Sequence, residues 1–252
     1  MYTDYDRFAW IYNKYWGSSF TGRVFPVLDQ MILQHIAPGS KLLDVCCGTG
    51  QLAAILTQKG YTVTGIDGSA EQLKYAAQNA PAATFIHEDA RHFILPAEYD
   101  AAFSFYDSLN HLMAVDDLTA VFRRVAAALK PGGRFLFDLN TEESFMSNWR
   151  GSFGEAHGDH AFIARAEYHQ SSQIAAIDVT IFTLQNDHWQ RSDVNLTQRS
   201  YTQEEVENAL KETGFKDIQM KKALEDLKMQ GNTGRVFFLA RRDSNDLTQK
   251  SL

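Results

Sequence analysis

The sequence lacks features that several classes of protein require. It has two cysteines, Cys46 and Cys47, which are neighbours and therefore cannot link distant parts of a fold. No stretch approaches the roughly 20 consecutive apolar residues that span a bilayer. The opening residues show no basic patch followed by an apolar core, so a secretory signal is not expected. These absences favour a cytoplasmic protein that does not enter a membrane.

Clustered basic charge is missing as well. The 252 residues include 24 lysines and arginines against 31 acidic residues, which gives a formal net charge of −7. Broad contact with nucleic acid phosphates requires clustered basic side chains, so no nucleic acid partner is expected. The length suits one sizeable core, or one domain with an insertion.

The centre of the chain alternates between apolar strand patterns and amphipathic helix patterns. Strands that are joined by helices at short spacing pair in parallel, with the helices covering both faces of the sheet. The predicted fold class is therefore α/β, with a doubly wound, mostly parallel sheet. The expected strands are 41–46, 62–66, 83–87, 100–106 and 133–138, and the expected helices are 50–59, 69–80 and 117–129.

The two flanks follow other patterns. Helices are expected at 3–16 and 24–37, separated by the break GSSFTG. After the fifth strand, three strand-like stretches without helices between them predict an antiparallel insertion. A helix at 202–213 and strands at 215–221 and 234–240 then complete a seven-stranded sheet.

The stretch LLDVCCGTGQ runs from an apolar strand into a glycine-rich turn. Gly48, Gly50 and Ala53 satisfy the G-x-G-x-x-A dinucleotide pattern, with Asp67 at the end of the next strand. Glycines let backbone approach a ligand closely, and Asp67 could accept hydrogen bonds from ribose hydroxyls. The same residues could also form only a tight turn and a helix cap.

Further features accompany this turn. Asp44 would repel a pyrophosphate but could hold a cationic amino group through a bridging water, and Asp89 could accept from an exocyclic amine. The fourth strand has a polar and aromatic exit, FSFYDSLNHL, and the fifth is preceded by LKPGG. In this order, the motifs D-x-C-C-G-T-G, G-I-D, E-D-A and L-K-P-G-G resemble the class I S-adenosylmethionine-dependent methyltransferases over about residues 40–140.

The resemblance implies S-adenosyl-L-methionine as cofactor and a small-molecule acceptor. The family's usual glycine at position 46 is a cysteine here. The implied contacts are Asp44, Cys46, Gly48 and Gly50 around the methionine part, Asp67 with Gly68 beside it at the ribose, Asp89 at the adenine amine, the Ala90 backbone at the ring, and Phe105 under the cofactor.

The opening FAWIYNKYW is similar to the N-terminal helix of small-molecule methyltransferases, including sugar-amine N-methyltransferases, which carry a tyrosine over the cofactor. Tyr12 is the first match to that tyrosine and Tyr15 the second, although these aromatics could simply seal the helix onto the sheet. The stretch 160–200 resembles the β insertion that some relatives place as a wall over the substrate.

Methyl transfer from a sulfonium is an in-line displacement, for which an enzyme mainly supplies alignment and exclusion of water. His111 is the best-placed candidate for a base, with Tyr12 as a second catalytic candidate, and a capping role for His111 is equally open. Asp107 and Asn110 could position an acceptor, and Tyr15 and Tyr106 are further candidates for contact with it. The acceptor atom, nitrogen or oxygen, stays open.

The adjacent cysteines are interpreted as small apolar fillers of the turn. No set of histidines and cysteines with zinc spacing accompanies them, and redox pairs have the pattern C-x-x-C, so no metal is expected. Two other functions remain open, a nicotinamide-dependent oxidoreductase and a non-catalytic cofactor-binding module. A monomer or homodimer is expected. The predicted parts are a helical lid (1–39), a Rossmann-like cofactor core (40–140), a β insertion (141–200), a C-terminal helix and strands (201–242) and a flexible tail (243–252).

Overall fold

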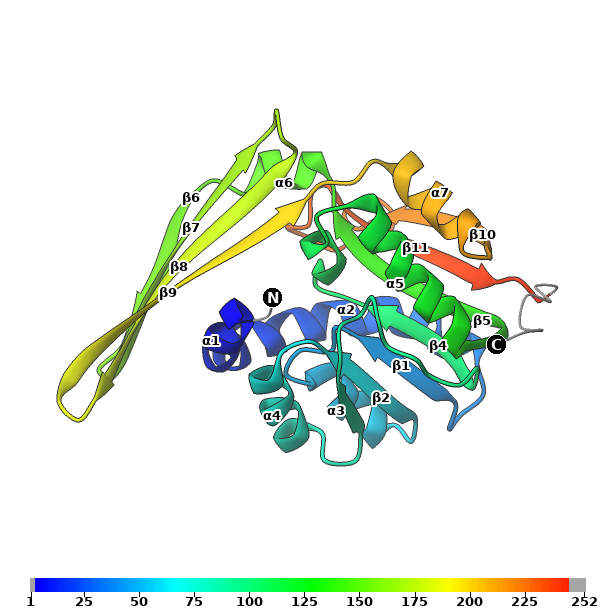
Figure 1. The fold of residues 1–252 in the computed structure, drawn as a ribbon, viewed down its shortest axis with the longest axis horizontal. Helices are drawn as coiled ribbons and strands as arrows, with labels where there is room; N and C mark the ends of the chain where they lie inside the picture. Colours follow the sequence, from blue (N-terminus) through cyan, green and yellow to red (C-terminus); the bar gives the residue numbers. More distant parts are fainter. Residues whose placement is uncertain (1–2, 245–252) are drawn as a thin grey trace.

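The computed structural model describes residues 3–244, which form an α/β body with a projecting antiparallel sheet (Figure 1). The body contains a seven-stranded sheet of order β10-β11-β5-β4-β1-β2-β3, in which β11 runs antiparallel to both neighbours. The predicted fold class is confirmed. The strands are β1 (Lys41–Val45), β2 (Thr62–Asp67), β3 (Thr84–His87), β4 (Tyr99–Ser104), β5 (Leu129–Asn140), β10 (Phe215–Lys222) and β11 (Arg235–Arg242).

Helices cover both faces of this sheet. On one face, α2 (Gly17–Met31) and α3 (Gln51–Gln58) bury apolar side chains against the strands, with α4 (Ala70–Asn79) beside α3. On the other face, α5 (Val115–Ala128) and α7 (Gln203–Glu212) pack against a phenylalanine-rich surface of β5 and β11. Because strands and helices are apolar where they meet, the alternating pattern predicted these elements closely.

The start of β5 differs from the sequence-based expectation. LKPGG was expected to form a turn before a strand at 133–138, whereas β5 already begins at Leu129. Tyr99 pairs with Leu129 and Ala101 with Arg134, so the register shifts between the two pairs. The extra residues form an irregularity inside this interior strand, and such an irregularity accommodates proline and glycine.

The N-terminal segment also differs. The expected break at GSSFTG is wrong, because α1 (Thr3–Ile11), a π-helical turn η1 (Tyr12–Trp16) and α2 follow one another without interruption. Thr21 donates its hydroxyl to the carbonyl of Gly17 at 2.7 Å, and Phe20 is buried, so this polar stretch is stable as helix. The helix ends at Met31, and a short turn η2 (Leu33–His35) follows.

The insertion contains four strands rather than the expected three. β6 (Gly151–Ala156), β7 (His160–His169), β8 (Ile174–Gln185) and β9 (His188–Arg199) form a meander that projects from the body (Figure 1). Every residue of β6 is exposed, so no apolar alternation revealed it in the sequence. The short helix α6 (Glu142–Asn148), just before β6, was also not predicted.

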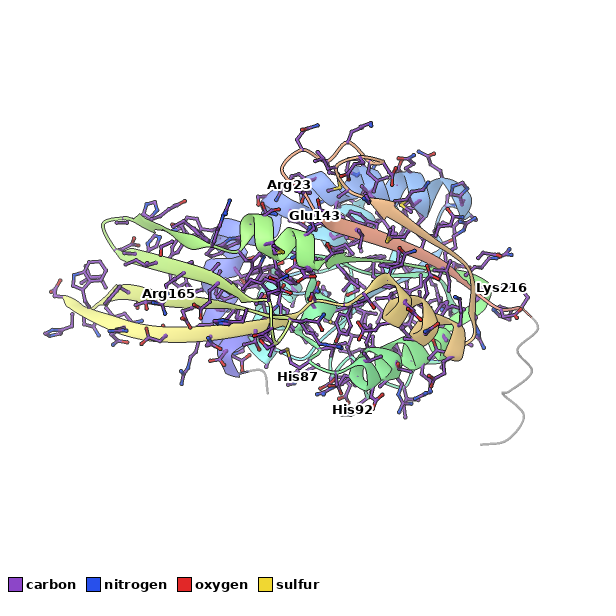
Figure 2. The ribbon with its side chains drawn as sticks, turned by 90° about the horizontal axis from the view of Figure 1, so that it is seen from above. Arg23, His87, His92, Glu143, Arg165 and Lys216 are labelled. Carbon is purple, nitrogen blue, oxygen red and sulfur yellow. The ribbon has the colours of Figure 1, made fainter. Side chains whose placement is uncertain are left out.

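The two faces of the insertion differ in character. Phe162, Val179 and Val194 on the inner face pack against Phe8 and Ile11 of α1. The outer face carries ion pairs, for example between Arg165 and Asp178 at 2.9 Å. Figure 2 shows Arg165 on the projecting sheet. Helix α1 also contacts α4, so the N-terminal segment bridges the insertion and the body.

Two sequence-based expectations concern the ends of the chain and its surroundings. The predicted flexible tail falls, from residue 245 onward, outside the described residues. None of the helices within residues 3–244 combines the length and the apolarity that a bilayer crossing requires.

Candidate active site

A cavity of about 580 Å³ opens at the carboxyl ends of the parallel strands. The strand order reverses between β1 and β4, and open α/β sheets bind ligands in the crevice at that point. Side chains of α1 and η1 cover the cavity, and the insertion supplies a side wall. The cavity lining includes residues from four places. These are Cys46, Gly48, Asp67, Gly68 and Ala90 at or after the strand ends, Tyr106, Asp107 and His111 after β4, Tyr12 and Trp16 from the N-terminal segment, and Leu196 and Gln198 from β9.

The two glycines of the turn have different surroundings. Gly48 has a φ of +55° and lines the cavity, where an added Cβ would lie 3.4 Å from the ring of Tyr12. Gly50 caps α3 with a φ of +76°, and a Cβ there would come within 2.9 Å of the Cα of Ala76 in α4. Gly48 is therefore open to a ligand, whereas Gly50 lies outside the lining and permits two helices to approach.

Two predicted carboxylates lie at different depths. Asp67 lines the cavity, with Oδ2 accepting from the N–H of Gly48 at 2.8 Å and Oδ1 from that of Ser69 at 2.9 Å. Burial raises the pKa of Asp67, and these donors oppose the rise. Asp44 is buried on β1 behind the lining, and burial together with the charge of Asp67 raises its pKa.

An additional acceptor lies beside the glycine turn. Gln72 of α4 is buried and lines the cavity, and its Oε1 has no hydrogen-bond partner among the described residues. A Cβ on Gly48 would be 3.8 Å from that oxygen. Such an acceptor, next to the Asp67 carboxylate, fits a ligand rich in N–H and O–H donors. S-adenosylmethionine has such donors on its amino group, ribose and adenine, so this end of the cavity fits the implied cofactor.

The acid after β3 is held by a neighbouring arginine. Nε of Arg91 donates to Oδ1 of Asp89 at 3.0 Å, and Nη2 donates to Oδ2 at 2.7 Å. Arg91 also reaches Asp117 of α5 at 3.0 Å. Ala90, Arg91 and Asp117 line the cavity, whereas the Asp89 carboxylate stands behind Arg91. The adenine contact of Asp89 stays a prediction.

The aromatic candidates point to different sides. Tyr12 faces the cavity, with its ring centroid 5.7 Å from that of Tyr106, and burial raises the pKa of its phenol. Tyr15 is turned toward the insertion, where its hydroxyl contacts Nε2 of His160. Phe105 is buried outside the lining and stacks on Phe103 with centroids 5.5 Å apart. Of these, only Tyr12 and Tyr106 share the cavity.

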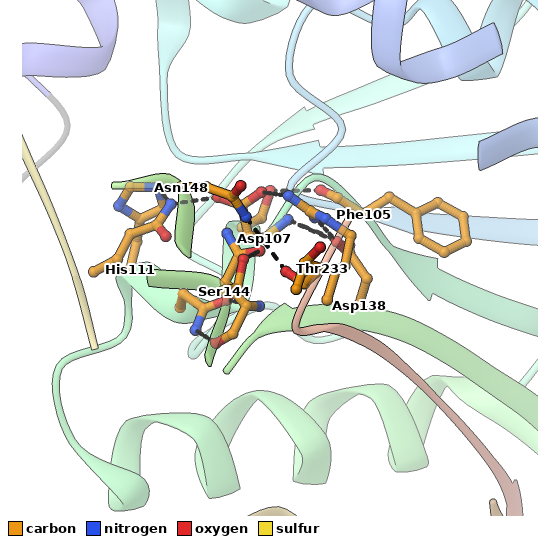
Figure 3. A network of polar contacts seen from close by, with 12 residues as sticks. Phe105, Asp107, His111, Asp138, Ser144, Asn148 and Thr233 are labelled. Atoms are coloured by element: carbon orange, nitrogen blue, oxygen red, sulfur yellow. Dashed lines mark hydrogen bonds and ion pairs between the residues drawn. The ribbon is translucent and has the colours of Figure 1, made fainter. Parts of the chain in front are cut away.

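A buried network of charges lies behind the polar exit of β4 (Figure 3). Nη2 of Arg235 donates to Oδ1 of Asp107 at 2.7 Å, and Nη1 contacts the carboxylate of Asp138. The N–H of Asp107 donates to both oxygens of Asp138 at 3.2 Å. Burial raises the pKa of Asp138 to about 6, against the lowering effect of Arg235. Burial alone would lower the pKa of Arg235, but the two carboxylates raise it, so the guanidinium stays charged.

His111 is tied into the same network through Gln198 of β9. Its Nδ1 lies 2.7 Å from the carbonyl oxygen of Thr197, so Nδ1 carries the proton and donates it. The remaining lone pair, on Nε2, faces Nε2 of Gln198 at 3.0 Å. Burial lowers the pKa of His111, which favours this neutral form. To act as a base, His111 would first have to lose its contact with Gln198.

Asn110 lies outside the lining and connects three elements. Its Nδ2 donates to the carbonyls of Asn140 at 2.9 Å and Arg199 at 2.8 Å, and its Oδ1 accepts from the N–H of Asn140 at 2.9 Å. Its side chain thus holds the end of β9 against β5. Contact of Asn110 or Tyr15 with an acceptor stays a prediction.

Several residues of the site were not identified from the sequence, among them Arg91, Gln72, Gln198 and Arg235. Arg91 had a local signal, since a cation two residues after an acid can pair with it. Gln72, Gln198 and Arg235 had none, because they reach the cavity from elements with no motif of their own.

Comparison with known proteins gives a consistent result. Residues 42–133 match the family model described as a methyltransferase domain. The putative methyltransferase YqeM of Bacillus subtilis is 30% identical over 208 residues, which are 80% of this chain and 84% of that protein. The dTDP-3-amino-3,6-dideoxy-alpha-D-glucopyranose N,N-dimethyltransferase of Streptomyces fradiae is 34% identical over 106 residues, 42% of each chain.

Among solved structures, an S-adenosylmethionine-dependent methyltransferase from Clostridium acetobutylicum has the same fold. It superposes with a TM-score of 0.75 at 22% identity, covering 95% of this chain and 99% of that one. The likeness therefore extends over the insertion as well as the core.

Proposed function

Because the chain belongs to the class I S-adenosylmethionine-dependent methyltransferases, we propose that it transfers a methyl group to a nitrogen or oxygen of a small molecule by in-line displacement. The observation that carries this proposal is one cavity lined by two chemically different sets of residues. Gly48, Asp67 and Gln72 supply acceptors and open backbone, and aromatic side chains such as Trp16 and Trp149 supply apolar surface. When bound, S-adenosylmethionine supplies a methyl group activated by its sulfonium.

The acceptor-rich set would hold the cofactor. Asp67 would accept from the ribose hydroxyls, because each of its oxygens keeps a lone pair after binding one N–H. Cys46, Gly48, Gly68 and the Ala90 backbone would form the surrounding surface, with Tyr12 over it. Asp44, Gly50, Asp89 and Phe105 lie behind these residues. Asp44 would reach the cofactor's amino group through a bridging water, and Asp89 would accept from the adenine amine.

The aromatic set would hold the acceptor and exclude water. Tyr106 and Asp107 line the cavity, and residues of the insertion such as Leu196 line its side. Holding the nucleophile about 3–3.5 Å from the methyl group in a dry site accounts for much of the acceleration in such reactions. In this role the segment 1–39 acts as a lid and 141–200 as a wall. His111 would orient Gln198 while neutral, and would act as base for an acceptor that arrives protonated.

Family membership decides against the nicotinamide interpretation of the G-x-G-x-x-A pattern. The name of the Streptomyces fradiae relative specifies an amino sugar, which supports a small molecule as the substrate. A monomeric or homodimeric enzyme without a nucleic acid partner remains our prediction.

Calorimetry with S-adenosylmethionine, S-adenosylhomocysteine and NAD tests the cofactor assignment. We expect micromolar or tighter binding of the first two and none of NAD. The same protein, supplied with S-adenosylmethionine and a panel of amines, alcohols and phenols, should then form S-adenosylhomocysteine with at least one of them. Cofactor binding without turnover on any acceptor, including a metabolite extract, would instead indicate a non-catalytic binding module.

A further inference from the structure

Gln198 has one oxygen that the protein leaves without a partner. The residue is 3% exposed, lines the cavity, and its Oε1 makes no hydrogen bond with any described residue. Leu196, two positions earlier on β9, lines the cavity too, as expected for side chains on the same face of a strand. A buried acceptor without a donor is unfavourable, and its cost is removed when a ligand supplies the donor.

The orientation of this amide is fixed by its neighbours. Nε2 of Gln198 donates to Oδ2 of Asp107 at 2.5 Å and faces Nε2 of His111 at 3.0 Å. Both partners act as acceptors, because the Asp107 carboxylate also accepts from Arg235 and His111 carries its proton on Nδ1. Turning the amide over would bring Oε1 against two acceptors. Oε1 is therefore held in a position where no protein donor reaches it.

The position of Gln198 associates this oxygen with the acceptor rather than with the cofactor. Gly48 lies in the turn after β1, Asp67 ends β2 and Gln72 belongs to α4, whereas Gln198 comes from the insertion and contacts the exit of β4. Beyond the polar neighbours Asp107 and His111, the cavity lining includes apolar and aromatic side chains, among them Leu196, Trp149 and Phe153. The site thus offers a neutral acceptor in a cavity whose walls are partly apolar.

We propose that Oε1 of Gln198 recognises the methyl acceptor by accepting a hydrogen bond from its hydroxyl or neutral amine, and that the acceptor is a molecule with an apolar body and such a donor. This rests on the proposed function, whose cofactor site is separate from Gln198. Asp107 and His111 act on the acceptor through Gln198, by holding the amide in one orientation.

Two matched pairs of probes test the proposal. 4-Ethylphenol and 4-ethylaniline carry a donor and are neutral near pH 7, whereas 4-ethylanisole and N,N-dimethyl-4-ethylaniline lack it. Their binding to protein saturated with S-adenosylhomocysteine can be measured by ligand-observed NMR. We expect at least one donor probe to bind about fivefold or more tightly than its donor-free partner.

Variants connect this preference to the amide. In Gln198→Met, the affinity of a donor probe should lie within about twofold of the affinity of its donor-free partner. Gln198→Asn should have the same effect, because its side chain is one methylene shorter and withdraws the oxygen. Gln190→Met, on the exposed part of β9, should keep the wild-type ratio. Equal binding within both pairs, absence of binding by all four probes, or a preference that persists in both Gln198 variants would overturn the proposal. Retained binding of S-adenosylhomocysteine in the same samples would separate that failure from a failure of the proposed function.

Discussion

Replacing Arg235 with methionine should be among the most damaging single changes in the core. The guanidinium pairs with Asp107 and Asp138, and all three side chains are at most 10% exposed. Removing one member of a buried ion pair leaves charge uncompensated and typically costs about 3–5 kcal/mol. We expect a loss of that size in the free energy of unfolding near pH 8, measured by urea denaturation.

The loss should depend on pH in a defined direction. The pKa of Asp138 in the folded protein is about 6, above the value of about 3.9 for an ordinary aspartate, and it should rise further without Arg235. A carboxyl group whose folded pKa is raised binds its proton more tightly in the native state, so stability falls as pH rises from about 4 through the folded pKa. The cost of Arg235→Met should therefore be smaller at pH 5 than at pH 8.

A matched control lies on the same strand. Arg241 pairs with Asp217 at the surface, where both side chains are about half exposed, so Arg241→Met should cost less than about 1 kcal/mol at either pH. The double variant Arg235→Met/Asp138→Asn should recover part of the stability lost in the single variant. A cost below about 1 kcal/mol for Arg235→Met, or a cost independent of pH, would refute this reasoning.

Three further outcomes are expected. Asp67→Ala should weaken binding of S-adenosylmethionine by more than about 1 kcal/mol in calorimetry, because charge-assisted hydrogen bonds are lost; unchanged affinity would exclude the ribose contact. Cys46→Ala and Cys47→Ala should leave methyl transfer largely intact in a product assay, since burial raises both thiol pKa values and keeps the thiols protonated; complete loss in a folded variant would argue for thiol chemistry. Gly50→Ala should lower the free energy of unfolding by at least about 1 kcal/mol, because its left-handed backbone and its contact with Ala76 leave no room for a Cβ; a neutral result in urea denaturation would contradict that reading.

The sequence was most informative where local pattern and tertiary environment agree. The apolar strands and the glycine turn are local signals, and the structure has the corresponding elements. The break at GSSFTG was wrong because small polar residues are also acceptable in a helix when one face, here through Phe20, is buried.

The residues of the candidate site could be predicted from the sequence only in part. Residues of the glycine turn and the strand ends lie within motifs, so they could be named. The ion pair of Arg235 with Asp107 spans 128 residues, and the contact of Gln198 with His111 spans 87. Neither has a recurring local pattern, because the topology of the sheet and the insertion brings these residues together.

The bridging position of α1 has a kinetic consequence. Its side chains Phe8 and Ile11 are buried against the insertion, and the adjoining turn η1 places Tyr12 beside Gly48 and Trp16 against Phe162 of the insertion. The N-terminal segment thus lines the cavity beside the glycine turn and beside the insertion, so displacing it would expose both places together. Substitutions that tighten this packing would raise thermal stability while slowing the exchange of spent cofactor and product, and turnover at saturating substrate would fall with them.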